Sequence, residues 1–307
     1  MKTELTLAIC SHNPRPQYFE RVLNSIRDQS LPKELWDFIV VDNRSDVPLA
    51  DVWDLSWHPR GRHVFAGELG LAAARRCAIE ASSSELLVFV DDDNVLDRNY
   101  LQEAIKIRDN FPFLGVWGSG AITPEFEIPP DKSIETLLPY LALRTTDVAK
   151  WCNFLPCPEA TPWGAGLCVR SKVARTYLDL RDRAIAISDR QGKTLLSGGD
   201  VEISYVANHL GYGTGVFPEL RLLHLIPKER LSRSYLLKVC EGTAISNRLL
   251  AYKWEGREPV RTSKIRYWLS FLKNLLLLHG IERQIYLADQ RAATIATDII
   301  TSTKQAS

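Results

Sequence analysis

Three consecutive carboxylates, Asp91-Asp92-Asp93, directly follow the apolar run 86–90. Close like charges raise one another's pKa unless a cation or strong hydrogen-bond donors compensate. A hard divalent cation such as Mg²⁺ or Mn²⁺ compensates well, because it binds one or two carboxylates and completes its shell with water and substrate phosphates. A solvated acidic turn would have the same composition. The position after a buried strand favours the metal.

A second acidic position, Asp42-Asn43, follows the apolar run 38–41. Its carboxylate can accept hydrogen bonds from a nucleobase or a ribose, although a turn-forming Asx pair would have the same sequence. Arg75 and Arg76 precede the acidic triad on a predicted helix. An arginine there can neutralise a phosphate or pair with a carboxylate, and a solvated helix face is the alternative.

A glycine-rich turn, PWGAG at 162–166, precedes a third apolar run. Glycines let the backbone approach a ligand closely, and Trp163 offers a flat surface of the kind that stacks on sugar rings. A tight turn with a core tryptophan is equally compatible. The segment lacks the Gly-x-x-x-x-Gly-Lys-Ser/Thr pattern, which excludes a P-loop.

Two glycines precede Asp200 at the start of an amphipathic helix. This placement exposes the acid to a ligand, so Asp200 is a candidate general base, with Glu202 as its nearby alternative. Asp200 also suits the N-cap of the helix, and both roles can hold together. His224 lies in an apolar segment, where a lone histidine is more often a hydrogen-bonded core residue than a metal ligand.

Strand and helix patterns that alternate along the first 110 residues must position these side chains. We expect strands at 5–10, 38–41 and 86–90, and helices at 18–29, 69–81 and 97–108. Strands that are apolar on both faces, with helices between them, indicate a parallel sheet with right-handed crossovers. Ligands of open α/β sheets bind at the carboxyl ends of the strands, so Asn13, Asp42 and Asp91 should meet in one site.

The later part of the chain has a looser pattern. Residues 118–165 contain many Pro, Gly and aromatic residues, which predicts loops and short strands over the sheet. Residues 231–252 and most of 262–300 have helical patterns, and the best domain boundary lies near 227.

Composition excludes several classes of function. The formal net charge of +1 gives no global field toward nucleic acid. Six cysteines without a Cys-x-x-Cys pair indicate reduced, mostly buried thiols in a cytosolic chain. The sequence has neither a signal-like apolar segment at its start nor an uninterrupted apolar stretch of about 18 residues. We therefore expect a cytoplasmic protein, either soluble or peripheral at the inner face of the plasma membrane.

The order and spacing of these motifs over about residues 4–230 resemble family 2 glycosyltransferases. The resemblance is carried by Leu7 to Asn13, Ile39 to Asn43, Ala74-Arg75, Val90 to Asp93, Gly164 to Gly166, Gly199-Asp200 and His224. It implies the GT-A fold, an α/β structure with a mostly parallel central sheet flanked by helices. Residues 1–227 would form the catalytic domain, with a donor half at about 1–115 and an acceptor half at 116–227. Residues 228–307 would form a helical C-terminal extension.

The resemblance and the residue chemistry together assign roles to the predicted site. The predicted donor-binding residues are Ser11, Asn13, Asp42, Arg75, Asp91 and Asp92, and the predicted acceptor-binding residues are Trp163, Gly164 and Ala165. Asp91, Asp93 and His224 would hold Mn²⁺ or Mg²⁺, and Asp92 should matter least. Asp200 would be the catalytic base. Gly199 replaces the glutamate that usually precedes this acid, which leaves open whether Glu202 shares its work.

These assignments predict an inverting, metal-dependent hexosyltransferase that moves a sugar from a nucleoside diphosphate sugar, expected to be a UDP-sugar, to a hydroxyl of a saccharide or a lipid-linked saccharide. The segment 222–235 resembles bacterial members that build exported polysaccharides, including hormogonium polysaccharide transferases. One alternative is a sugar nucleotidyltransferase, which usually carries a Gly-rich basic loop where this chain has Ser11 to Arg15. Another is a non-catalytic nucleotide-sugar-binding protein, which would not need all of these acids.

The segment 267–278 is apolar except for Ser270, Lys273 and Asn274, which fall on one helical face. Basic residues precede it. Such an amphipathic helix suits a membrane surface that carries a lipid-linked acceptor, with contact through residues 264–281. A helix packed on the catalytic domain has the same pattern, and both interpretations stand.

Overall fold

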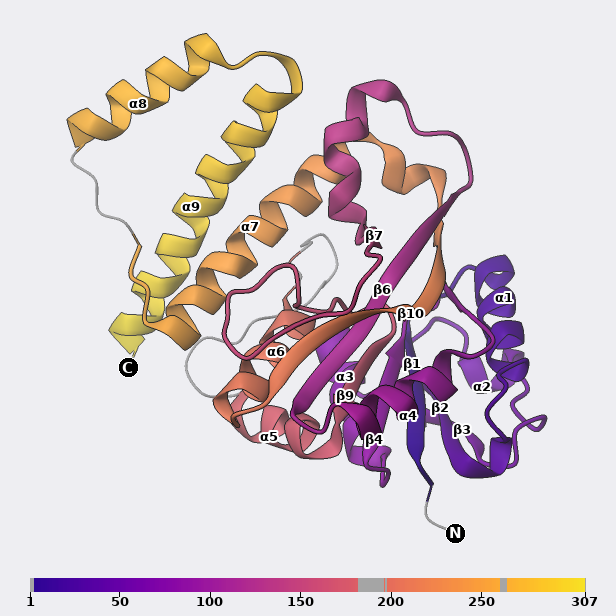
Figure 1. Cartoon of the computed structure of the whole chain (residues 1–307). Helices are drawn as coiled ribbons and strands as arrows, with labels where there is room; N and C mark the ends of the chain where they lie inside the picture. Colours follow the sequence, from indigo (N-terminus) through magenta and orange to yellow (C-terminus); the bar gives the residue numbers. More distant parts are fainter. Residues whose placement is uncertain (1–2, 182–195, 197, 260–263, 307) are drawn as a thin grey trace. The chain divides into compact units, whose positions relative to one another are not determined.

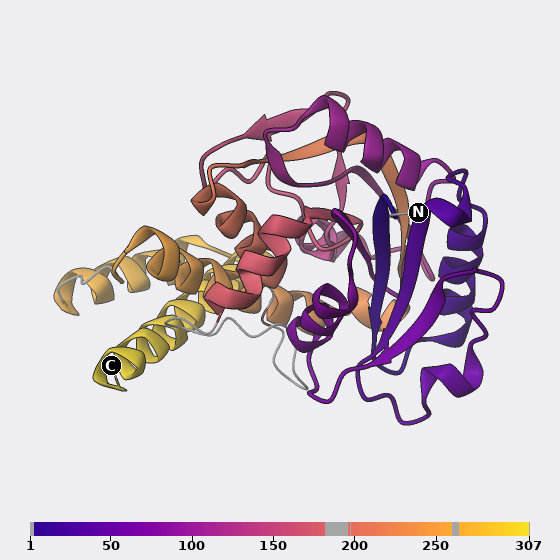
Figure 2. The same cartoon turned by 90° about the horizontal axis from the view of Figure 1, so that it is seen from below.

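Four strands form the parallel half of the central sheet in the order β3-β2-β1-β4. They are β1 (Leu5–Ser11), β2 (Trp36–Asp42), β3 (Gly61–Phe65) and β4 (Leu86–Val90). In this computed structural model, which describes residues 3–181, 196, 198–259 and 264–306, β2 and β4 are buried along their whole length. Helices on both faces of the sheet explain why these strands carry no polar alternation (Figure 2).

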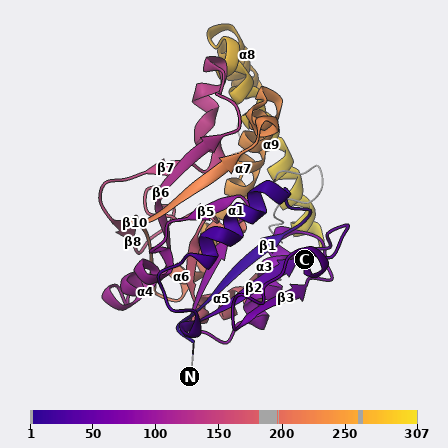
Figure 3. The same ribbon diagram turned by 90° about the vertical axis from the view of Figure 1, so that its right-hand side faces the viewer.

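Two helix layers cover these strands. The helix α1 (Pro16–Arg27) packs Phe19, Val22 and Ile26 against the sheet face that carries Leu7 and Val40 (Figure 3). The helix α4 (Tyr100–Asn110) joins the same core, whereas α3 (Leu71–Ala81) contacts β1 and β2 through its alanine-rich face. The short helices η1 (Lys33–Leu35) and α2 (Leu49–Val52) lie in the connections around β2.

Beyond β4 the sheet continues in the order β9-β6-β10-β5. The strand β9 (Leu167–Arg170) runs antiparallel between β4 and β6 (Leu114–Phe126), and β10 (Gly213–Ile226) runs parallel to β6 along most of its length (Figure 1). The strand β5 (Asn94–Leu96) pairs antiparallel with β10. Three short segments complete this region: β7 (Arg144–Thr145) pairs with β6, β8 (Lys150–Cys152) pairs with β10, and α5 (Ser171–Arg181) follows β9. The longest ladders are parallel, which confirms the predicted fold class.

The prediction of loops and short strands from residue 118 onward was wrong for the 13-residue strand β6. Its glycines, which suggest turns in the sequence, are places where other backbones approach closely. A Cβ added at Gly120 would lie 2.5 Å from the carbonyl carbon of Phe217, and one added at Gly118 would lie 2.9 Å from Pro162 Cβ. The strand therefore uses glycine for packing space, which a single sequence does not distinguish from turn formation.

The chain divides into two compact units. The first comprises residues 1–127, 142–181 and 199–226, and the second comprises 128–141, 182–198 and 227–307. The first contains the sheet and α6 (Gly199–His209). The second contains η2 (Lys132–Leu141), η3 (Lys228–Leu231), α7 (Arg233–Glu255), α8 (Lys264–Leu277) and α9 (Gly280–Ala306).

The helices α7 and α9 form the core of the second unit. Ion pairs join Arg248 to Asp289 at 2.7 Å and Arg291 to Glu241 at 2.6 Å. Three alanines of α9, namely Ala288, Ala292 and Ala296, are buried and recur every four residues, so they lie on one face of the helix. Small side chains at this spacing allow close helix packing. No helix within the described ranges is long and apolar enough to cross a membrane.

The six cysteines are all free thiols. Cys152, Cys168 and Cys240 are buried and the other three are half-buried, as expected for reduced thiols.

His58 is buried in an aromatic cluster, with its ring centroid 4.2 Å from that of Trp36 and 5.7 Å from that of Trp57. Burial lowers the pKa of His58 to about 4. Its Nδ1 accepts a hydrogen bond from the Arg60 backbone N–H at 3.2 Å, which requires the unprotonated nitrogen. The unfolded chain therefore binds a proton that the folded chain excludes between about pH 6.5 and pH 4.

Stability should consequently fall by about 2 kcal/mol through His58 alone when the pH is lowered from about 7 to about 5. Urea unfolding at both pH values measures this loss. The variant His58→Phe keeps an aromatic ring without a titrating group and should have a shallower pH dependence. Equal pH slopes for the variant and the wild type would contradict this assignment.

Candidate active site

The carboxyl ends of β1 and β4 meet at the acidic triad. The Ser11 hydroxyl donates a short hydrogen bond to Asp92 Oδ2, which joins residues 81 positions apart. Burial raises the pKa of the neighbouring Cys10 thiol to about 12; Arg75 opposes this shift, and the charges of Asp91 and Asp92 add to it. These interactions place Ser11, Arg75, Asp91 and Asp92 of the predicted donor site around one point. The parallel register of β1 and β4 brings Ser11 and Asp92 together.

Asp42 organises the loop after β2. Burial alone would raise the pKa of Asp42, but backbone N–H donors from Ser45 at 2.8 Å and Leu49 at 2.9 Å lower it. The carboxylate is therefore ionised and both of its oxygens accept bonds from the loop. This is the Asx-type role that the sequence left open. A contact with the donor nucleotide would use the remaining lone pairs of these oxygens.

Asn13 and Asn43 tie neighbouring loops to this edge of the sheet. Asn13 has a φ of 49°, accepts from the Asp46 N–H at 2.8 Å and donates to the Asp46 carboxylate at 3.0 Å. Asn43 accepts from the Gly70 N–H at 2.7 Å, just before α3 begins. The predicted contact of Asn13 with the donor would therefore involve an exposed loop that is held in place by its neighbours.

Asp93 and His224 are brought together by β5 and β10. Asn94 lies opposite His224 in the antiparallel register, and its Nδ2 donates to Asp93 Oδ1 at 3.0 Å. His224 Nε2 is 3.6 Å from Asp93 Oδ2, and both side chains are buried. The carboxylate of Asp93 suits Mn²⁺ or Mg²⁺, whereas the imidazole of His224 is a softer ligand. Within the described part of the chain, however, no three His, Cys, Asp or Glu side chains converge closely enough to hold an ion.

Asp200 is held against the glycine-rich turn. The Gly164 N–H donates to Asp200 Oδ2 at 2.7 Å, and the Val201 N–H donates to Oδ1 at 2.9 Å. A Cβ added at Gly164 would lie 2.5 Å from Arg75 Nη2 and 3.5 Å from Asp200 Oδ2. Glycine at this position thus lets α3 and α6 present a guanidinium and a carboxylate to the same small space. Arg75 therefore lies near the candidate base, and its charge also acts on Cys10 beside the acidic triad.

The alternative base Glu202 is placed differently. It is buried on α6, two positions beyond Asp200. Two helical positions rotate a side chain by about 200°, so Glu202 faces away from Asp200 and the turn at Gly164.

Trp163 is covered on one ring face by Arg144, a residue that sequence reasoning missed. The Arg144 guanidinium carbon lies 3.9 Å from the ring centroid, and its Nη2 donates to Thr161 O at 3.0 Å. Burial lowers the pKa of Arg144 to about 10, while the charge of Asp200 opposes this shift. No local pattern marks Arg144, because β7, where it lies, is only two residues long.

The end of the glycine-rich turn is tightly packed. Gly166 has a φ of 71°, and its carbonyl oxygen accepts a hydrogen bond from the Tyr100 hydroxyl at 2.6 Å. A Cβ there would lie 2.1 Å from the Tyr100 oxygen. Ala165, the third predicted acceptor-binding residue, is buried, and its carbonyl oxygen accepts from Ser119. Within the turn, Gly164 contacts the candidate base Asp200, whereas Ala165 and Gly166 attach the turn to Ser119 and Tyr100.

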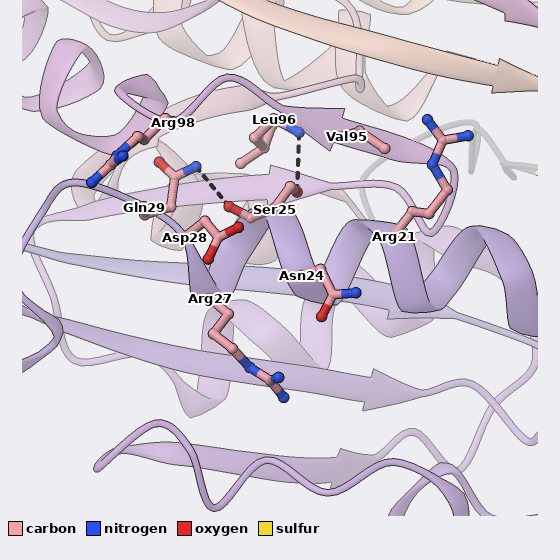
Figure 4. A pocket seen from close by; sticks show the side chains of 9 residues that line it. All are labelled: Arg21, Asn24, Ser25, Arg27, Asp28, Gln29, Val95, Leu96 and Arg98. Carbon is pink, nitrogen blue, oxygen red and sulfur yellow. Dashed lines mark hydrogen bonds between the residues drawn. The ribbon is translucent and has the colours of Figure 1, made fainter.

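A pocket of about 720 Å³ lies elsewhere in the first unit, between α1 and β5 (Figure 4). It is lined by polar side chains, among them Arg21, Arg27 and Arg98. These three arginines point in different directions, and no predicted site residue lines the pocket (Figure 4). It is therefore separate from the candidate active site.

The mixed, mostly parallel sheet flanked by helices matches the GT-A fold of glycosyltransferases. Residues 6–148 match the family described as Glycosyl transferase family 2. This segment, which is a little less than half of the chain, is that of a family 2 glycosyltransferase. No narrower assignment to hormogonium polysaccharide transferases follows from the match. Comparison with curated protein sequences finds no significant match.

Solved structures share the fold at low sequence identity. S. aureus TarS 1–349 in complex with UDP-GlcNAc is 14% identical with a TM-score of 0.52, and the match covers 100% of this chain and 92% of that chain. The mannosyltransferase PcManGT from Pyrobaculum calidifontis, in complex with GDP-Man and Mn²⁺, is 17% identical with a TM-score of 0.54. That match covers 100% of this chain and 76% of the other.

Proposed function

We propose that this glycosyltransferase moves a sugar from a nucleoside diphosphate sugar to an acceptor hydroxyl with inversion at the anomeric carbon. The observation that carries the proposal is the junction at Gly164, where Arg75 and the Asp200 carboxylate converge. This reaction requires a cation that binds the donor phosphate and a base that takes the proton of the acceptor hydroxyl. The two groups must lie within about the length of one sugar of each other. The nucleotide-sugar complexes of the two similar structures support the donor class.

The donor would occupy the edge formed by residues 1–115, with Asp42 and the loop of Ser11 and Asn13 around the nucleoside. Arg75 would pair with a phosphate oxygen. Asp91, Asp93 and His224 are the residues that would hold Mn²⁺ or Mg²⁺, which when bound neutralises charge on the departing diphosphate. The Mn²⁺ in the PcManGT complex supports a divalent metal beside the donor.

The acceptor would lie on the side formed by residues 116–227. Trp163 is half-buried against the core and would contact a sugar through the part of its ring that is exposed, and the Gly164 N–H holds Asp200 in a fixed orientation. Asp200 would take the proton of the attacking hydroxyl as its oxygen bonds to the anomeric carbon. We propose a saccharide or a lipid-linked saccharide as the acceptor, a UDP-sugar as the donor, and cell-surface polysaccharide synthesis as the setting.

Thermal unfolding of the protein with UDP, GDP and their sugars, each with and without Mn²⁺, tests the donor and the metal together. A ligand at about 100 times its Kd stabilises the folded state by about 2.7 kcal/mol, which is a shift of several degrees. We expect one nucleotide to give this shift with Mn²⁺ and to lose most of it in EDTA. No shift with any nucleoside diphosphate would overturn the proposal. Pyrophosphate release from a nucleoside triphosphate and a sugar phosphate would instead identify a nucleotidyltransferase.

A further inference from the structure

One face of α8 carries a continuous row of large apolar side chains that are open to solvent. Trp268, Leu272 and Leu276 follow one another at intervals of four residues, so they lie one above the other on the same helical face. Leu269 and Leu277 belong to the adjacent row. These five side chains, the apolar stripe, are between 53% and 77% exposed. Five such residues within ten positions are far more than the scattered apolar residues of an ordinary surface.

Another side of α8 already has a partner within the second unit. Phe271 is only half-exposed, and its ring centroid lies 6.1 Å from that of Tyr286 on α9. Its centroid is also 5.7 Å from that of Trp268, in an edge-to-face arrangement. Phe271 thus attaches α8 to α9 and contacts Trp268, while the four leucines of the stripe remain exposed. The exposure of the stripe is therefore not explained by the packing of α8 on α9.

The charged residues in the sequence of this segment are all cations. Between Glu258 and Glu282 the sequence contains Arg261, Lys264, Arg266 and Lys273, and it contains no Asp or Glu. Lys273 lies in the same row as Leu269 and Leu277, between them, and is exposed. A long cationic side chain beside exposed leucines can keep its ammonium at a polar boundary while its stem covers apolar surface.

We propose that the apolar stripe docks α8 on the surface of a membrane that contains anionic lipids. An exposed apolar face that carries Lys273, in a segment whose sequence has four cations and no acid, matches the acyl chains and anionic headgroups of such a surface. A second copy of the chain fits less well, because two copies of this cationic segment would repel one another. The helix has 14 residues and is about 21 Å long, which suits a position along the surface.

Membrane docking goes beyond the proposed function, and its test involves no sugar transfer. The whole protein is sedimented with vesicles of phosphatidylcholine alone and with vesicles that also contain phosphatidylglycerol. We expect binding to the mixed vesicles, much weaker binding to phosphatidylcholine, and a several-fold loss in about 0.5 M NaCl. The double variant Leu272→Glu/Leu276→Glu should lower the bound fraction at low salt at least tenfold. Lys273→Glu should weaken binding to the mixed vesicles only.

Val52→Glu is the matched control, because Val52 is also an exposed apolar residue on a helix but lies in α2 of the first unit. It should sediment like the wild type, and circular dichroism should show the same helical content for all variants. Equal sedimentation of the double variant and the wild type would overturn the proposal. So would light scattering that shows a dimer in the wild type and a monomer in the double variant, because the stripe would then bind a second copy.

Discussion

Replacing Asp200 with Asn should lower the rate of sugar transfer by about 10²–10⁴-fold while nucleotide binding persists. The amide oxygen of Asn can still accept the Gly164 N–H, which now reaches Asp200 Oδ2 at 2.7 Å, so the geometry of the turn should survive. The amide cannot take a proton from the acceptor hydroxyl. The loss should therefore appear in kcat and leave the thermal shift produced by the nucleotide and Mn²⁺ unchanged.

Glu202→Gln is the informative companion to this variant, because Glu202 is the alternative base and lies buried on the same helix. We expect Glu202→Gln to retain transfer in proportion to its folded fraction, which urea unfolding measures separately. Near-normal turnover of Asp200→Asn together with an inactive but folded Glu202→Gln would move the base to Glu202. It would also require α6 to present a different face to the acceptor.

The second large effect should come from the acidic triad. Asp91→Asn and Asp93→Asn each remove a charged oxygen that the ion would bind, so each should weaken Mn²⁺ binding by more than the about 10–100-fold loss typical of residues that only support a ligand. Transfer should fall in parallel, and added Mn²⁺ should restore part of it. A Mn²⁺ titration followed by electron paramagnetic resonance, with and without nucleotide, measures the affinity directly.

Asp92→Asn supplies the control within the triad. Its Oδ2 accepts a hydrogen bond from Ser11, and an amide oxygen can accept the same bond. We expect a loss of Mn²⁺ affinity much smaller than at the two flanking positions. If Asp92→Asn is as damaging as Asp91→Asn, Asp92 also takes part in binding the ion, and the assignment of ligands must be changed.

The local pattern of the sequence was sufficient for the parallel core. A strand of five apolar residues such as β4 is buried on both faces wherever helices flank it, and its bounds, Leu86–Val90, are those that the pattern predicted. The polar residues at the ends of β1, β2 and β4 lie at one edge by the same logic, because parallel strands present their carboxyl ends together. Patterns of this kind depend on neighbouring residues only, so one sequence contains them in full.

Only the tertiary structure decided which distant side chains meet. The contact of Asp93 with His224 depends on the pairing of β5 with β10 across more than a hundred residues, and a three-residue strand such as β5 has no pattern of its own. Arg144 reaches Trp163 through the equally short β7. The same is true of the junction at Gly164: the sequence determined that a glycine, an arginine and an acid were present, whereas the packing of α3 and α6 against the turn determined that they share one space. Register between distant segments is set by which packing arrangement buries the most surface without a clash, and that is a property of the whole fold.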